Sequence, residues 1–272
     1  RLDAAEEVEA ADWFDQSKQP VVISAEDGIQ LHGWLFDPDC AGAKPHLYAI
    51  CCHGYSGQPQ DMAKYAHRFA RLGFTVLVPA LRGHGLSEGR YAGMGWLDRR
   101  DLMRWISLII DSDADARILL QGKSMGAAAV MMTVGEPDLP RNVVAAVEDC
   151  GYASVGQQFI DCARSMFHLP KFLAKPIVTT MGAIARRRAG YGFQEASCVE
   201  QLKHATIPML FIHGGADDFV PSRALDENFD ACASIDRQKL LIPSAGHSMS
   251  ASTAPVVYWK TVTNFVTRVF GL

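Results

Sequence analysis

The sequence lacks the long apolar segments of membrane-spanning proteins. Its longest candidate, Phe172 to Ala185, is interrupted by Lys175 and Pro176. A spanning helix needs about 20 mostly apolar residues in a row, so nothing in the sequence predicts one. No internal repeat or low-complexity segment is evident either. With 272 residues, of which 49% are hydrophobic, the chain can form one large domain around a buried core.

A surplus of basic residues is also absent. The chain has 26 Lys and Arg against 30 Asp and Glu, which gives a formal net charge of −4. This balance argues against nucleic acid or an anionic membrane surface as the main partner. The one dense cluster of cations is Arg186-Arg187-Arg188, which we interpret as a solvated helix face.

The sequence shows no spacing typical of metal ligands. Neither Cys-x-x-Cys nor His-x-x-x-His occurs, so we predict no metal site. The number of cysteines is odd, and several of them lie in apolar runs that read as strands. We therefore expect buried free thiols in a reducing compartment. The seven cysteines are Cys40, Cys51, Cys52, Cys150, Cys162, Cys198 and Cys232.

The most informative stretch present is a short apolar run followed by Gly122-Lys123-Ser124-Met125-Gly126. A Gly-x-Ser-x-Gly turn places a serine on a sharp strand-to-helix corner with its hydroxyl exposed. The glycines avoid collisions with the neighbouring strand and helix, and Met125 opens the helix with its N–H free to meet negative charge. By itself the pattern is weak, because an ordinary glycine-rich turn also matches it.

Apolar strands and amphipathic helices alternate along most of the chain. The first two strands are expected to form an antiparallel hairpin that turns at Gly28. Strands are expected at 20–24, 29–36, 46–52, 74–79, 116–121, 143–147, 207–212 and 239–242. Helices are expected at 1–18, 60–72, 96–110, 127–134, 222–232 (capped by Ser222) and 255–270. Nearly all-apolar strands that alternate with helices predict a mainly parallel sheet covered on both faces.

On these motifs the chain resembles the α/β-hydrolase superfamily, and in particular its bacterial esterase-like branch. The resemblance covers roughly residues 20–270 and rests on four places. They are His53-Gly54-Tyr55-Ser56-Gly57, Arg82-Gly83-His84-Gly85-Leu86-Ser87, the Ser124 turn, and the segments that contain Asp217 and His247. It implies the α/β-hydrolase fold: a mostly parallel eight-stranded sheet, helices on both faces, and a small helical cap.

The resemblance also implies a catalytic triad, because Asp217 and His247 follow the serine turn in the family's order. Ser124 would be the nucleophile. His247, in a loop after the last strand, would be the general base, because a serine hydroxyl needs a base within hydrogen-bond reach. Asp217 would bind the far ring nitrogen of His247, fix its tautomer and stabilise its protonated form.

Three other residues compete for these roles. Asp218 is adjacent to Asp217, but alignment with the family pattern selects Asp217. Some relatives place the acid after the strand that follows the serine turn, which makes Asp149 a third candidate. His53 precedes the serine turn, the wrong order for the base in this family, so we interpret it as a structural histidine that anchors its loop.

Residues 152–204 break the alternation, because about fifty residues contain no expected strand, which exceeds an ordinary crossover. Apolar residues recur there at helical spacing. We interpret this segment as a helical cap over the serine, with a pair of ordinary packing helices as the alternative. The expected organisation is a hydrolase core at 1–151 and 205–272 with a cap insertion at 152–204.

The expected function is hydrolysis of carboxylic esters with small to medium apolar acyl groups, through an acyl-enzyme on Ser124. The backbone N–H groups of Met125 and Tyr55 would form the oxyanion hole, the latter as implied by the resemblance. No metal or organic cofactor is required. The alternatives are a peptidase or amidase of the same fold, and a non-catalytic hydrolase-fold binding protein.

The remaining expectations concern partners and location. A small-molecule ester is the expected partner, with no nucleic acid, and the sequence does not predict the oligomeric state. We expect a cytoplasmic protein. Because the sequence begins with Arg1 rather than Met, a membrane anchor or export signal would have to come from a segment outside it.

Overall fold

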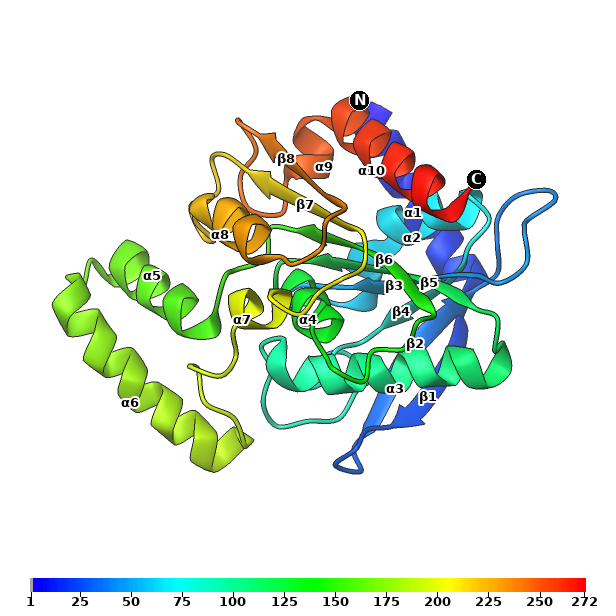
Figure 1. The fold of residues 1–272 in the computed structure, drawn as a ribbon. Helices are drawn as coiled ribbons and strands as arrows, with labels where there is room; N and C mark the ends of the chain where they lie inside the picture. The colour runs from blue at the N-terminus through cyan, green and yellow to red at the C-terminus, as the bar shows by residue number, and fades with distance from the viewer. Residues whose placement is uncertain (1) are drawn as a thin grey trace.

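The computed structural model describes residues 2–272, with side chains from residue 4 onward. An eight-stranded sheet runs through the molecule, and helices lie against both of its faces (Figure 1). The strand order is β1-β2-β4-β3-β5-β6-β7-β8. The pairs β1–β2 and β2–β4 are antiparallel, and every later pair is parallel. The predicted α/β-hydrolase sheet, mostly parallel and eight-stranded, is therefore confirmed.

The elements follow the predicted alternation closely. The strands are β1 (Gln19–Ser24), β2 (Gln30–Phe36), β3 (Leu47–Cys52), β4 (Thr75–Pro79), β5 (Arg117–Lys123), β6 (Val143–Asp149), β7 (Met209–Gly214) and β8 (Arg237–Ile242). The helices are α1 (Leu2–Ser17), η1 (Pro59–Met62), α2 (Ala63–Arg71), α3 (Trp96–Ser112), α4 (Met125–Val134), α5 (Val155–Phe167), α6 (Lys171–Ala189), α7 (Cys198–Leu202), α8 (Arg223–Ala231), α9 (Ser250–Thr253) and α10 (Pro255–Phe270). Residue 1 of the helix expected at 1–18 lies outside the described residues.

The parallel strands are apolar throughout because both faces of the sheet are covered. Successive residues of a strand point to opposite faces. Leu120 of β5 therefore packs in the core shared with α3 and α4, whereas Leu119 packs in the core shared with α2 and α10. This arrangement explains why the inner strands read as continuous apolar runs rather than as alternating ones.

Two local expectations need correction. The helix expected from residue 60 begins with the 3₁₀ turn η1, and α2 itself starts at Ala63. Ser222 precedes α8 as expected, but its backbone is already helical and its hydroxyl accepts no capping hydrogen bond.

All seven cysteines are free thiols: five are buried, Cys162 is half-buried and Cys40 is exposed.

Residues 152–204 contain α5, α6 and α7. The strand-like contact in this segment of the described chain is a single bridge between Ser154 and Ser197. The hairpin of α5 and α6 stands at one side of the sheet (Figure 1). The boundaries 152 and 204, and the role of the segment as a cap, remain predictions. No helix among residues 2–272 is long and apolar enough to cross a membrane.

The corner between β5 and α4 packs directly against the end of β3. A Cβ atom on Gly126 would collide with the carbonyl oxygens of Cys52 and His53. Both obstacles are backbone atoms, so a side chain at this position could be accommodated only by moving β3 or α4. The glycine therefore sets how closely the helix approaches the sheet.

We predict that Gly126→Ala lowers the free energy of unfolding by about 1–3 kcal/mol, because the added methyl group overpacks this contact. The measurement is urea denaturation followed by circular dichroism. Gly156→Ala is the matched control, since the nearest atom to its new Cβ, the Phe193 carbonyl oxygen, is 3.5 Å away. Equal stability of the two variants would contradict the packing argument.

Candidate active site

Ser124 occupies the corner between β5 and α4 with φ +56° and ψ −118°. A positive φ is strained for a residue with a side chain, so the surroundings must hold it. The Ser124 N–H donates to the Asp149 carbonyl at 2.8 Å, and its carbonyl accepts from the Ala128 N–H at 3.0 Å. These two bonds fix the corner, and the Ser124 side chain lines a cavity.

The hydroxyl of Ser124 meets a histidine from the other end of the chain. Ser124 Oγ lies 2.8 Å from His247 Nε2, and His247 Nδ1 lies 2.7 Å from Asp217 Oδ2. A neutral imidazole that donates from Nδ1 to the carboxylate has Nε2 free to accept the serine proton. The structure thus brings together all three residues predicted from the sequence, in the order that this chemistry needs.

The Asp217 carboxylate is buried and accepts several hydrogen bonds. Its Oδ1 accepts hydrogen bonds from the backbone N–H groups of Phe219 at 3.0 Å and Val220 at 2.8 Å. Burial by itself would raise the pKa of this carboxyl. The hydrogen bonds with His213, His247 and the backbone hold the pKa well below its usual range instead. Asp217 is therefore ionised at every pH near neutrality.

Two buried residues behind the carboxylate were missed by the sequence reasoning. His213 Nε2 lies 3.4 Å from Asp217 Oδ2 and 3.0 Å from the Val220 carbonyl oxygen. Burial lowers the pKa of His213, but Asp217 and Glu148 outweigh it and raise the pKa. Burial raises the pKa of Glu148 to about 8. The available signal was the His213-Gly214 pair at the end of β7, four residues before the acid.

The competing acids lie elsewhere. The Asp149 carboxylate accepts a hydrogen bond from the Tyr258 hydroxyl at 2.9 Å, and burial raises its pKa to about 6. Asp218 is exposed to solvent. The carboxylate within hydrogen-bond distance of His247 is that of Asp217, so the geometry favours it over both neighbours.

His53 holds a loop in place. It is fully buried, its Nε2 accepts from the Leu81 N–H at 3.0 Å, and its Nδ1 lies 2.8 Å from the Gly54 carbonyl oxygen. Burial lowers the pKa of His53 to about 4, so the ring stays neutral. A neutral ring tied at both nitrogens links the loop after β3 to the end of β4.

The two predicted oxyanion donors flank the serine. Met125 is the first residue of α4, so its N–H belongs to the first turn, where helical N–H groups have no partner within the helix. Tyr55 follows Gly54, and a Cβ on Gly54 would lie 3.2 Å from the Cβ of Ser124. The loop after β3 therefore passes close to the serine, which supports the predicted role of the Tyr55 N–H.

An apolar cavity of about 480 Å³ adjoins Ser124. Its walls come from the loops after β3 and β4, from the corner between β5 and α4, from α5 and α6 with the loops on either side of them, and from the loop after β7. Aromatic side chains dominate the lining: Tyr55, Tyr91, Tyr152, Phe159, Tyr191 and Phe193. Phe219 lies at the edge with its ring 5.0 Å from that of His247. None of the described residues that line the cavity is an aspartate or glutamate, and the charged residue among them is Arg188.

One group of potential metal ligands occurs within the described part of the chain. Ligand atoms of Cys150, Asp217 and His247 lie within 4.8 Å of one another. The Asp217 and His247 atoms already bond to each other, and burial raises the pKa of the Cys150 thiol, which keeps it protonated. We therefore assign no metal to this group.

Comparison with known proteins identifies a family and several relatives. A family model described as serine aminopeptidase, S33, matches residues 43–181, about half of the chain, and the match includes the Ser124 turn. The uncharacterized protein YqkD of Bacillus subtilis is 26% identical over 255 residues, which cover 93% of this chain and 81% of YqkD. The uncharacterized protein Rv2307c of Mycobacterium tuberculosis is 29% identical over 230 residues, covering 84% of this chain and 72% of Rv2307c.

The fold itself also has solved counterparts. The esterase Pf2001 of Pyrococcus furiosus superimposes with a TM-score of 0.73 at 20% sequence identity, over 93% of this chain and 92% of that one. At 20% sequence identity, this similarity shows only that the two proteins share a fold. Together with the family match, it identifies the chain as a member of the serine aminopeptidase S33 family of α/β-hydrolases.

Proposed function

We propose that this serine hydrolase cleaves carboxylic esters that carry small to medium apolar acyl groups. The observation that carries the proposal is a serine hydroxyl 2.8 Å from an imidazole nitrogen, beside a largely apolar cavity. Cavities of this size hold small molecules, and their apolar walls favour burial of apolar groups.

Acylation begins when Ser124 Oγ attacks the ester carbonyl carbon while His247 Nε2 takes the hydroxyl proton. The new negative charge on the carbonyl oxygen is met by the N–H groups of Met125 and Tyr55. Each such donor contributes about 3 kcal/mol to transition-state stabilisation. The carbon–oxygen bond to the alcohol then breaks, and His247 returns its proton to the leaving oxygen.

Deacylation repeats the sequence with water. Neutral His247 removes a proton from a water molecule, whose oxygen attacks the acyl carbon. The bond to Ser124 Oγ breaks, and Oγ regains a proton from His247, which leaves free acid and enzyme. Throughout the cycle, ionised Asp217 stabilises the imidazolium that forms twice. The chemistry needs no metal or organic cofactor.

The relation to serine aminopeptidases favours amide or peptide cleavage as a second candidate. An aminopeptidase must also hold the positive amino terminus of its substrate, and a buried carboxylate is the usual partner for such a charge. The described lining of the cavity offers aromatic rings and Arg188, but no carboxylate. This composition is the reason for ranking esters first.

We expect Ser124→Ala to lower kcat/KM for p-nitrophenyl butyrate by several orders of magnitude, because the nucleophile is lost. The comparison substrate is an aminoacyl p-nitroanilide. Faster hydrolysis of the anilide by the wild type would favour the peptidase candidate. Equal ester hydrolysis by the variant and the wild type would exclude Ser124 chemistry and favour a binding protein.

Asp217→Asn should reduce kcat by about three to four orders of magnitude, since an amide cannot stabilise the imidazolium and favours the wrong tautomer. Asp218→Asn is the matched control: it makes the same change at an exposed neighbour and should leave kcat within about twofold of the wild-type value. Steady-state kinetics on the same ester measure both. The opposite ranking would move the acid role to Asp218.

The pH profile should show a single loss of activity on the acid side. The pKa of Asp217 lies well below its usual range, so this carboxylate keeps its charge as the pH falls. General-base catalysis by an imidazole requires its neutral form, so kcat/KM should fall on the acid side. A profile that stays flat between about pH 5 and pH 8 would contradict a histidine base.

A further inference from the structure

Helix α6 has its apolar residues on the unexpected side. Its buried positions hold the small or short side chains of Ala174, Val178 and Gly182. Its larger apolar side chains face solvent, and Phe172 is 75% exposed. An ordinary surface helix buries its large apolar side chains and exposes polar ones. The outer face of α6 is therefore built to contact something other than water.

The exposed apolar surface continues across the turn into α5. Phe167, the last residue of α5, is 70% exposed, and Met166 beside it is 62% exposed. We call this surface the hairpin face. Its members are Met166, Phe167, Phe172, Leu173, Ile177 and Ile184. Large exposed apolar side chains gathered on one helical hairpin mark an interaction site.

The same segment is strongly basic, which the net charge of the whole chain conceals. Residues 162–194 carry six Lys and Arg and no Asp or Glu, although the chain as a whole has a net charge of −4. The six are Arg164, Lys171, Lys175, Arg186, Arg187 and Arg188. The expectation against an anionic membrane surface as the main partner was drawn from the net charge of the whole chain.

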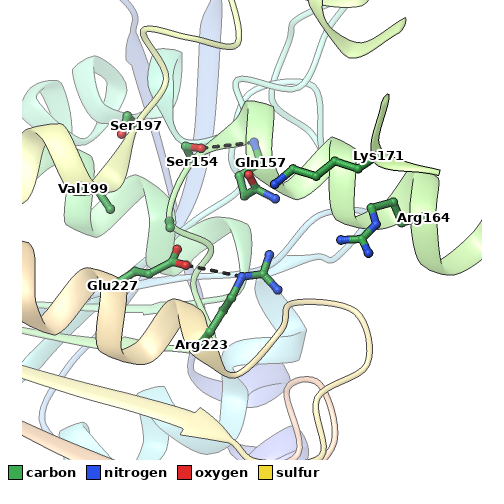
Figure 2. A pocket seen from close by; sticks show the side chains of 9 residues that line it. Ser154, Gln157, Arg164, Lys171, Ser197, Val199, Arg223 and Glu227 are labelled. Atoms are coloured by element: carbon green, nitrogen blue, oxygen red, sulfur yellow. Dashed lines mark hydrogen bonds and ion pairs between the residues drawn. The ribbon is translucent and has the colours of Figure 1, made fainter. Parts of the chain in front are cut away.

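Part of this charge gathers at an open cleft of about 590 Å³ beside the hairpin. Figure 2 shows Arg164 and Lys171 reaching into the cleft from α5 and α6, near Gln157. Arg223 enters from α8, where it contacts Glu227 at 3.4 Å and also pairs with Asp161. Two of the cations at the cleft are thus close in sequence to the exposed phenylalanines: Arg164 lies three residues before Phe167, and Lys171 directly precedes Phe172.

We propose that the hairpin face docks on a bilayer of anionic phospholipids. The large apolar side chains enter the interface, and the flanking lysines and arginines contact the lipid phosphates, with Arg164 and Lys171 at the cleft. Helices that lie in a membrane surface combine an apolar face with lysine and arginine in this way. Ile184, a member of the hairpin face, also lines the catalytic cavity, as does Met181 of the same helix, so docking places that cavity beside the bilayer.

A second copy of the chain fits this surface less well. In a two-fold symmetric dimer the same patch of both subunits forms the contact, so the basic segment of one subunit would lie against the basic segment of the other. Like charges brought together in this way repel, whereas a layer of anionic lipid attracts them. The charge therefore selects a membrane over a dimer as the occupant of the hairpin face. The docking is independent of the ester chemistry proposed above.

The test is sedimentation of the intact chain with vesicles of phosphatidylcholine, either pure or with about one-third phosphatidylglycerol. We expect binding to the anionic vesicles, and weaker binding at about 1 M salt, where charges are screened. The double variant Phe167→Ser/Phe172→Ser should bind at least about tenfold more weakly, since two exposed aromatic anchors are removed. The double variant Lys171→Gln/Lys175→Gln should bind the anionic vesicles about tenfold more weakly than the wild type, since two lysines near the lipid phosphates are removed.

Matched controls remove exposed groups of the same kind elsewhere. Ile235→Ser/Val256→Ser removes two exposed apolar side chains, and Lys44→Gln/Lys260→Gln removes two lysines. Both controls should bind as the wild type does, and all four variants should hydrolyse a soluble ester at the wild-type rate. This soluble-ester assay separates a failure of docking from a failure of the proposed function.

Two results would overturn docking. The first is a wild-type chain that stays in the supernatant with anionic vesicles, or that binds no better than the hairpin variants. The second is a wild-type dimer in analytical ultracentrifugation that Phe167→Ser/Phe172→Ser converts to a monomer, without vesicle binding by either protein. That second result would assign the hairpin face to a second copy of the chain.

Discussion

The hydrogen bonds that join Ser124, His247 and Asp217 depend on the common direction of β5, β7 and β8. Parallel strands end at the same edge of a sheet, so the loops that follow them meet there. The serine follows β5, the aspartate follows β7 and the histidine follows β8. Residues separated by 123 positions in sequence thus come within 2.8 Å without a long connecting loop.

Close packing at the corner turns this arrangement into a defined geometry. Gly126 lets α4 approach the end of β3, and Gly54 lets the following loop approach Ser124. His53 ties the same loop to Leu81 through a neutral, buried ring. The serine and the predicted oxyanion donors therefore lie on elements with little freedom to move relative to one another.

Much of the fold and of the candidate site could be predicted because the relevant signals are local. Apolar runs predict the strands, and the glycines on either side of Ser124 predict a sharp strand-to-helix turn. The support behind Asp217 was not predictable in this way. Glu148 and His213 lie on two adjacent strands, and only the register of β6 and β7 brings the Glu148 carboxyl group near the His213 ring, which in turn lies 3.4 Å from Asp217 Oδ2. The pattern of a single sequence does not reveal how two strands are aligned with each other.

Helix α6 illustrates a different limit. Its residues have the spacing of a helix, and the sequence correctly places a helix there, but periodicity cannot say which face is buried. The structure buries Ala174 and Gly182, and the small Gly182 lets Phe193, in the loop after α6, pack closely against this side of the helix. The larger residues are then left outside. A net charge averaged over 272 residues likewise conceals a basic segment of about thirty.

The most direct test of the account is to find which side chain reacts as the nucleophile. The protein is treated with a fluorophosphonate, digested, and the modified peptide is sequenced by mass spectrometry. The account predicts a single phosphonylated residue, Ser124, because its hydroxyl lies 2.8 Å from an imidazole that an ionised carboxylate supports. Modification of another residue, or no modification of the folded protein, would contradict it.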